Sequence, residues 1–139
     1  MTMKGFFRIA LSLLCVIACS CQKEARTELL IGTWEVSISY RYDDRSVSTE
    51  TYDLGTWNYT FMENGKGSYI GVGDTQATDF TYSYNDVRNV ILLKAKGTTS
   101  ELVIDSLSGD RFVFYGYGTS TLGTAVYPIT ATFRGKKIK

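Results

Sequence analysis

Histidine is absent from the 139-residue chain, which removes the commonest general base and metal ligand at neutral pH. Ser-His-Asp and Cys-His nucleophilic sites are therefore excluded. All three cysteines lie within the first 21 residues, so the rest of the chain cannot form an internal disulfide. The chain also lacks a convincing carboxylate pair, a calcium loop and a glycine-rich phosphate loop. We expect a protein that is not an enzyme, with no catalytic residue, cofactor or metal.

An excess of charge of either sign is lacking as well. The chain has 15 Lys and Arg against 14 Asp and Glu, and Lys4 and Arg8 belong to the N-terminal signal described next. The one basic cluster is the C-terminal run 134–139. Because nucleic-acid binding depends on a basic surface, we expect no DNA or RNA partner.

The N-terminus has the charged and then apolar order of an export signal. Lys4 and Arg8 precede an apolar run over residues 9–18. This run is about half of the roughly 20 residues that a helix needs to span a bilayer, so a permanent transmembrane anchor is not expected. The run ends in Val16-Ile17-Ala18-Cys19, which resembles the lipobox of bacterial lipoproteins. The resemblance implies that Cys19 is acylated and becomes the new N-terminus.

A second candidate for the lipid-bearing residue is Cys21, because small residues also precede it and a charged tether, 22–24, follows it. The lipobox fits the first of the two cysteines better. Two or three acyl chains anchor a protein firmly, since each buried methylene contributes about 0.8 kcal/mol. The membrane is then a partner through the covalent lipid, and we expect the protein in the cell envelope, at the periplasmic face or the cell surface of an outer membrane. The sequence divides into a signal peptide over 1–18, a lipidated tether over 19–29 and a folded domain over 30–139.

The rest of the sequence alternates between apolar and polar residues with the period of two that is typical of strands. From Gly32 to Tyr42, for example, Trp34, Val36 and Ile38 fall on one face and Glu35 and Ser37 on the other. Eight strands are expected, at 32–42, 57–61, 68–72, 80–84, 90–95, 101–107, 111–117 and 125–134, with 47–53 as a weaker ninth.

Short turns join these strands, as at Asn64-Gly65 and Lys96-Gly97, so sequential strands must be antiparallel neighbours. No helix is available to cover the apolar face of such a sheet. The sheet must then close on itself or stack, and the regular spacing favours a small antiparallel up-and-down β-barrel of about eight strands. The single proline, Pro128, predicts an edge or a bulge in its strand.

The segment 30–36, Leu-Ile-Gly-Thr-Trp-Glu-Val, resembles the Gly-x-Trp first strand of lipocalins and fatty-acid-binding proteins. With a lipobox upstream and hairpins at matching intervals, the chain resembles the lipocalin-like lipoproteins of gut-type Gram-negative bacteria. The resemblance implies that Gly32 and Trp34 close one end of the barrel and that Arg134, on the last strand, lies across the indole ring. These roles are structural.

Aromatic residues dominate the expected inner face, and six of them are candidates to line a ligand cavity. An eight-stranded barrel is wide enough either to fill with side chains or to hold one small ligand, and the sequence leaves both alternatives open. The six candidates are Trp57, Tyr59, Phe80, Tyr82, Phe112 and Phe114.

Two functions follow from these alternatives. The first is a lipid-anchored barrel that binds a small hydrophobic or amphipathic molecule. The second is a non-catalytic interaction module with a filled barrel, which docks onto another envelope component through its longest loops, expected at 41–51 and 116–124.

Overall fold

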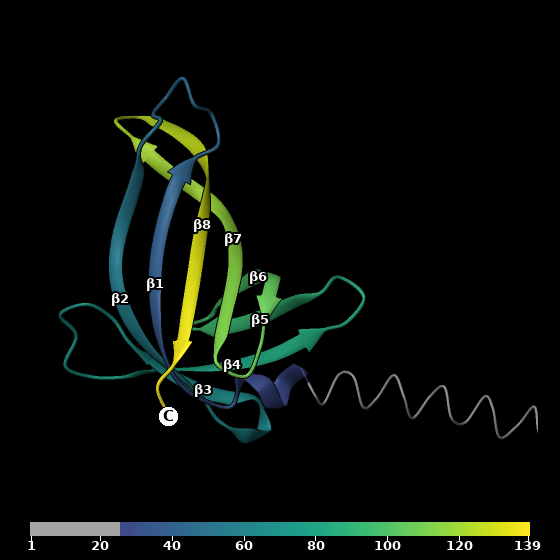
Figure 1. The fold of residues 1–139 in the computed structure, drawn as a ribbon. Coiled ribbons are helices and arrows are strands. Elements are labelled where there is room, and N and C mark those ends of the chain that lie inside the picture. The colour runs from purple at the N-terminus through teal and green to yellow at the C-terminus, as the bar shows by residue number, and fades with distance from the viewer. Residues whose placement is uncertain (1–25) are drawn as a thin grey trace, which may run out of the picture.

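A computed structural model describes residues 26–139 of the chain as one closed antiparallel β-barrel (Figure 1). The expected all-β fold with eight strands is confirmed. The strands are β1 (Gly32–Tyr42), β2 (Thr51–Phe61), β3 (Lys66–Ile70), β4 (Thr78–Asn85), β5 (Val90–Ala95), β6 (Thr98–Leu107), β7 (Arg111–Leu122) and β8 (Ala125–Lys137), with a 3-10 turn η1 (Glu63–Gly65) between β2 and β3. The signal peptide and both candidate lipidation sites lie outside the described residues.

Each strand pairs with the next one along the chain, and β8 returns to pair with β1, so the topology is up-and-down as expected. Tight turns make this possible. Asn64, Lys96 and the glycine that follows each of them have positive φ, which glycine and asparagine adopt most readily. The turn between β7 and β8 likewise has Gly123 at φ 63°.

The barrel is closed at one end and open toward the other, because its strands differ in length. β2 pairs with β3 only from Asn58 to Phe61, and β7 pairs with β6 only up to Gly116. Beyond these points β2, β1, β8 and β7 continue together as a four-stranded extension, which stands above the shorter strands in Figure 1. We call this extension, residues 39–55 and 117–132, the arm.

The closed end holds the core of the protein. A helical turn over residues 26–30 packs against it, and Leu30 is completely buried there. Thus part of the stretch 19–29, which the sequence assigns to the tether, is packed against the barrel. Trp34, Phe61, Phe112 and Phe114 are all at most 3% exposed. Burying side chains of this size contributes about 1.5–3 kcal/mol each, so the closed end supplies most of the hydrophobic stabilisation.

Two glycines make room for this packing. A Cβ on Gly135 would lie 2.3 Å from Cε2 of Phe112, and a Cβ on Gly67 would lie 2.4 Å from Cζ of Phe80. Each ring therefore lies close against the bare backbone of a glycine on a neighbouring strand. The aromatic side chains fill the closed end because glycine is opposite them.

Two details differ from the sequence-based expectation. The weak ninth strand does not exist as a separate element, since residues 45–47 form a turn and 51–53 are the beginning of a long β2. The expected loop over 116–124 is wrong, because β7 runs on to Leu122 and only 123–124 form the turn. In both places the flanking strands are extended by pairing within the arm. Pro128 lies beyond the last residue of β8 that pairs with β1, so the predicted edge position is confirmed.

Candidate functional site

Trp34 closes the end of the barrel through three contacts. Its indole Nε1 donates a hydrogen bond to the carbonyl oxygen of Leu30 at 2.8 Å, and its ring lies 4.8 Å from that of Phe112. The Nζ atom of Lys137 lies 5.0 Å from the centre of the indole ring. The same ammonium donates to the carbonyl oxygen of Leu29 at 3.0 Å, which ties the helical turn to β8.

The cation over the Trp34 ring is therefore Lys137, and the expectation that Arg134 takes this place is wrong. β8 pairs Lys137 with Trp34 and Arg134 with Ser37. Successive side chains of a strand point to opposite faces, so residues three apart cannot share the inner face. Arg134 is exposed on the outside of the barrel. Gly32 has a φ of 135°, and a Cβ there would lie 2.5 Å from the carbonyl oxygen of Lys139.

Four of the six candidate ligand-lining residues belong to the packed core. Phe80, Tyr82, Phe112 and Phe114 are between 1% and 6% exposed. The rings of Phe112 and Phe114 stack at 4.1 Å, and the Tyr82 hydroxyl donates to the carbonyl oxygen of Met62 at 2.7 Å. Phe112 stacks on Phe114 and Phe80 packs against Tyr82, so these side chains fill the closed end and do not line a cavity inside it.

The other two candidates, Trp57 and Tyr59, are half-buried above the core. The indole ring of Trp57 packs against the ring of Tyr69, with 5.6 Å between the ring centroids. Its Nε1 donates a hydrogen bond to the carbonyl oxygen of Leu54 at 3.0 Å. Burial, reinforced by the neighbouring Tyr69, raises the pKa of Tyr59 well above its usual value. Tyr59 is a partly buried side chain that packs against the hydrophobic core, and this environment favours the neutral phenol.

The open space lies on the opposite wall, where β6 and β7 separate. Below the split, Leu102 of β6 is opposite Gly116 of β7, and above it the first residues of β6 follow β5 while β7 follows β8. A cleft of about 550 Å³ occupies the gap. We call it the β6–β7 cleft.

The floor of the β6–β7 cleft is apolar. It consists of Ile129, Ala131 and Phe133 from β8 and Leu102 from β6. The register sets Phe133 opposite the buried Ile38, so this row of β8 side chains faces the barrel interior. In the cleft, the inner apolar surface of β8 is therefore exposed. At the closed end, aromatic side chains cover the corresponding inner surface.

Two glycines on β7 keep the β6–β7 cleft open. Gly116 and Gly118 alternate on the inner face, opposite Ala131 and Ile129. A Cβ on Gly118 would meet no atom within 4 Å, and one on Gly116 would lie 3.3 Å from the Phe133 ring. At the closed end, an aromatic ring occupies the space beside each of the two glycines. In the cleft, the space beside Gly118 stays open.

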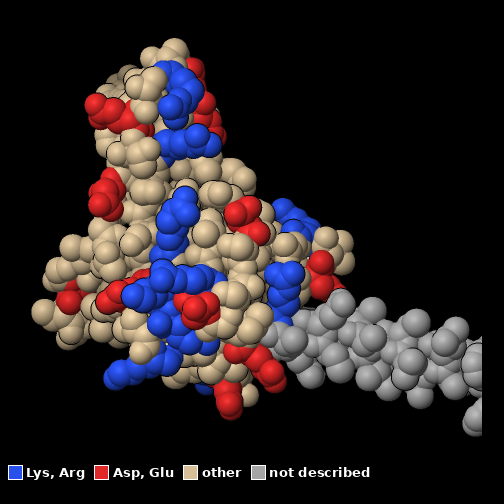
Figure 2. All heavy atoms as spheres, in the orientation of Figure 1, with Lys and Arg blue, Asp and Glu red and all other residues tan. Residues whose placement is uncertain are grey.

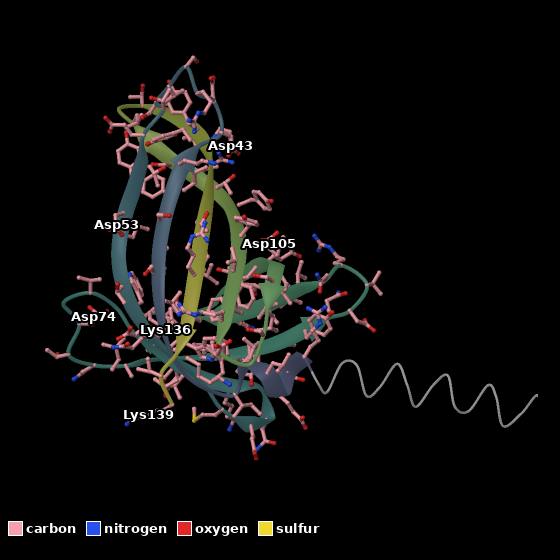
Figure 3. The ribbon with its side chains drawn as sticks, in the orientation of Figure 1. Asp43, Asp53, Asp74, Asp105, Lys136 and Lys139 are labelled. Atoms are coloured by element: carbon pink, nitrogen blue, oxygen red, sulfur yellow. The ribbon has the colours of Figure 1, made fainter. Side chains whose placement is uncertain are left out.

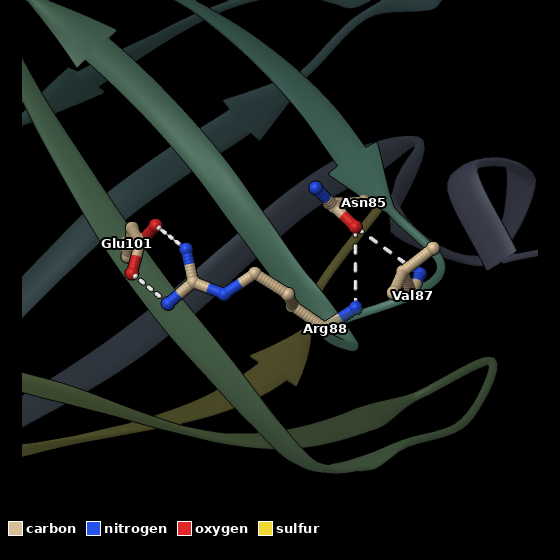
Figure 4. Close-up of polar contacts among 4 residues, drawn as sticks. All are labelled: Asn85, Val87, Arg88 and Glu101. Carbon is tan, nitrogen blue, oxygen red and sulfur yellow. Dashed lines mark hydrogen bonds and ion pairs between the residues drawn. The ribbon is translucent and has the colours of Figure 1, made fainter.

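The rim of the cleft is polar and carries one ion pair (Figure 4). Arg88 and Glu101 form a bidentate contact, with Nη2 donating to Oε2 at 2.8 Å. The Asn85 side chain accepts hydrogen bonds from the backbone N–H groups of Val87 and Arg88, which fixes the turn that presents the arginine. Both charged side chains are well exposed, so the pair stabilises the fold by less than about 1 kcal/mol. It is instead available to a ligand's polar group.

A second hollow, of about 630 Å³, lies on the outer face of β3, β4 and β5. Lys66, Lys94 and Lys96 surround it, together with an apolar edge from Met62 and Phe80. All three lysines are exposed, so water and salt screen their charges. The hollow is a less specific surface than the β6–β7 cleft.

The carboxylates of the described chain are dispersed. Figure 3 places Asp43, Asp53, Asp74 and Asp105 at separate points of the molecule. Three of them bind nearby groups: Asp43 accepts from the Thr130 hydroxyl, and Asp53 and Asp74 accept from glycine N–H groups. Among residues 26–139 no group of three Cys, Asp or Glu side chains is placed to hold a metal ion. Acidic and basic side chains are interspersed over the face that Figure 2 shows.

No helix within residues 26–139 is long and apolar enough to cross a membrane. Comparisons with protein-family models, with curated proteins and with solved structures find no match to this chain.

The residues of the β6–β7 cleft were not among the sequence-based candidates. Gly116 and Gly118 carry a signal that the sequence does contain, namely glycine at alternate positions of a strand, on the face that elsewhere carries large rings. Such a pattern predicts either close packing or open space. Only the neighbouring strands decide between the two.

Proposed function

We propose that the protein is a non-catalytic cell-envelope lipoprotein, anchored in the outer membrane by acyl chains on Cys19, or alternatively Cys21. Its lipocalin-like barrel binds a small hydrophobic or amphipathic molecule in the β6–β7 cleft. The lipobox and the export signal support the anchor, and the absence of histidine supports a binding role over a catalytic one. The cleft with its apolar floor is the observation that carries the ligand-binding proposal.

The cleft determines the chemistry of the ligand. A volume of about 550 Å³ lies in the range of small-molecule sites, and Ile129, Ala131 and Phe133 match an apolar ring or chain. Hydroxyl and charged groups are present only at the rim, from Ser100, Arg88 and neighbouring side chains. The ligand is therefore amphipathic, with its apolar part inside and its polar part at the opening.

Native mass spectrometry tests the ligand. The protein is purified from the envelope of its own host and is compared with the same sample after denaturation and refolding. We expect a bound mass that is lost on refolding, which also identifies the class of ligand. An apo mass in both samples contradicts the proposal.

A matched pair of variants locates the ligand in the β6–β7 cleft. Gly118→Leu fills the cleft from a position where an added side chain meets open space. Thr119→Leu adds the same side chain one residue further on, at an exposed position on the outer face. We expect the bound mass to disappear from Gly118→Leu and to remain in Thr119→Leu. Retention in both variants places the ligand elsewhere.

The interaction module is the second candidate function, and the packed core favours it. Since four of the expected lining residues fill the closed end, only the cleft and the outer surface remain for recognition. The arm presents exposed apolar side chains at its tip, Leu122 at 48% and Val126 at 61% exposure. Replacing both by serine tests this function, because we expect loss of an envelope partner in pull-downs of the variant. Unchanged recovery of all partners refutes it.

A further inference from the structure

One strand of the arm has an edge without a partner. β7 pairs with β8 from Arg111 to Leu122 but pairs with β6 only up to Gly116. Within residues 26–139 the backbone from Tyr117 to Leu122 therefore has a strand on one side only. Its outward amides and carbonyls form a regular row that can continue the sheet.

The opposite edge of the arm, formed by β2, is protected against pairing with another strand. There, β2 carries Asp53, and a bulge opposite Ser37 and Ser39 interrupts the ladder. The loop after β3 also covers it, since a Cβ on Gly55 would lie 2.6 Å from Val72. Charges, bulges and covering loops are the usual means by which proteins prevent edge pairing.

None of these means protects the β7 edge. The sequence from 112 to 133 contains no charged residue, and the exposed side chains beside the edge include Tyr117 at 67% exposure. Thr119 and Thr121 follow on the same outer face, both exposed. An uncharged strand edge without a bulge or a covering loop pairs readily with another extended segment.

The edge is also held in a fixed shape. The Tyr42 hydroxyl and the Ser120 hydroxyl are hydrogen-bonded at 3.1 Å, and Tyr42 is only 2% exposed. Its ring lies edge-on to those of Tyr52 and Tyr127, at 5.9 and 6.2 Å. These contacts form a small second core inside the arm, so a partner strand meets a backbone that is already extended.

We infer that the edge of β7 from Tyr117 to Leu122 binds an extended, uncharged segment of a partner polypeptide by β-strand addition. Main-chain hydrogen bonds supply the affinity in this mode, and alternate side chains supply the specificity. The partner segment is uncharged because a charged side chain beside Tyr117, Thr119 or Thr121 would be desolvated without an opposite charge to pair with.

The partner is a different polypeptide and not a second copy of this chain. Two β7 edges that pair about a two-fold axis run antiparallel, which sets the two arms in opposite directions. The helical turn at 26–30 lies at the closed end, so the two helical turns would then be at opposite ends of the dimer (Figure 1). Copies anchored in one membrane share one orientation. This exclusion rests on the proposed lipid anchor.

A synthetic strand tests the inference with the full chain in detergent micelles. The probe is a capped, dye-labelled peptide of alternating threonine and valine, and its control has N-methyl groups on alternate residues, which block the donors of one edge. We expect saturable fluorescence anisotropy with the probe and binding at least about tenfold weaker with the control, since two or more hydrogen bonds are lost. Equal binding of the two peptides, or none of either, overturns the inference.

Substitutions and amide exchange locate the bound strand. We expect Thr119→Lys combined with Thr121→Lys to weaken probe binding by about tenfold, because a lysine beside a paired edge loses its hydration. The control Thr51→Lys places a lysine at an exposed position on the other edge and should leave binding unchanged. By NMR, the probe should slow hydrogen exchange of alternate amides from Tyr117 to Leu122. Protection elsewhere places the peptide at another surface and refutes the assignment.

The test of peptide binding at the β7 edge can be distinguished from the test of ligand binding in the β6–β7 cleft. Gly118→Leu removes the ligand by filling the inner face, whereas the lysine substitutions alter the outer face. Failure of ligand binding with intact peptide binding leaves the β7 edge as the recognition surface. Sedimentation velocity of the full chain gives the remaining outcome, because a dimer that the lysine substitutions dissociate assigns the edge to a second copy and overturns the choice of partner.

Discussion

Adding one methyl group to each of two glycines tests the division of the barrel into a packed end and an open cleft. Gly135 and Gly118 both lie on the inner face, on the neighbouring strands β8 and β7, and neither has a φ in the left-handed region. Backbone strain therefore does not enter the comparison. What differs is the space that a Cβ would occupy.

At Gly135 the new methyl group meets the Phe112 ring, with three ring carbons within 2.3–2.6 Å. The ring cannot move aside, because it stacks on Phe114 at 4.1 Å and contacts Trp34 at 4.8 Å. Overpacking of this kind costs about 1–3 kcal/mol. Gly135→Ala is therefore expected to lower the free energy of unfolding by this amount.

At Gly118 nothing lies within 4 Å of the added methyl group. Replacing a glycine in a compatible conformation stabilises a protein by about 0.4–1 kcal/mol, since the unfolded chain loses conformational freedom. The two variants should thus differ by about 1.5–4 kcal/mol. For a domain of this size, each kcal/mol of change in the free energy of unfolding shifts Tm by roughly 4 °C or more.

Urea unfolding of the domain from Glu24 onward, followed by tryptophan fluorescence, measures the difference. The dependence of the free energy on urea should be equal in both variants, so that the midpoints can be compared directly. Equal midpoints for Gly135→Ala and Gly118→Ala would falsify the distinction between a filled closed end and an open cleft.

Three further outcomes are expected. Trp34→Phe removes the buried indole hydrogen bond and leaves a carbonyl oxygen unsatisfied, so urea unfolding should show that the free energy of unfolding falls by about 2–3 kcal/mol. The control Trp57→Phe should lower it by less than about 1 kcal/mol, because the hydrogen bond of that indole is exposed. Because burial raises the pKa of Tyr59 above its usual 10.0, the folded state retains a proton that the unfolded state loses, and stability should fall as the pH rises above about 10. Tyr59→Phe should weaken this fall, and an identical pH profile for variant and wild type contradicts the assignment. Cys19→Ser should abolish the acyl mass of the mature protein in intact-mass spectra while Cys21→Ser retains it, and the reverse result transfers the anchor to Cys21.

The sequence could not reveal where strands stop pairing. Alternation identified β1 and β4 to β8 because one face of each strand is buried, and it placed Phe112 and Phe114 inside correctly. It ended β7 at Tyr117 because glycine and threonine there resemble a loop. Pairing with β8 extends the strand to Leu122, and that contact is made by a segment further along the chain.

Register likewise lies beyond a reading of the sequence. The choice of cation over Trp34 depends on which residue of β8 faces the inner side opposite it, and a shift of one residue reverses every side chain. The structure selects Lys137 because the pairing of β1 with β8 sets it beside the indole ring. The resemblance to lipocalins had implied Arg134 instead.

The amino-acid sequence by itself determined the all-β class, the antiparallel order and the aromatic character of the inner face, because short turns and a period of two are local properties. The tertiary structure alone decided the β6–β7 cleft and the free edge of β7. Both arise where β6 and β7 part to follow different neighbours. A strand's partners are set by the lengths and registers of all eight strands together, so no local pattern can specify where a closed barrel opens.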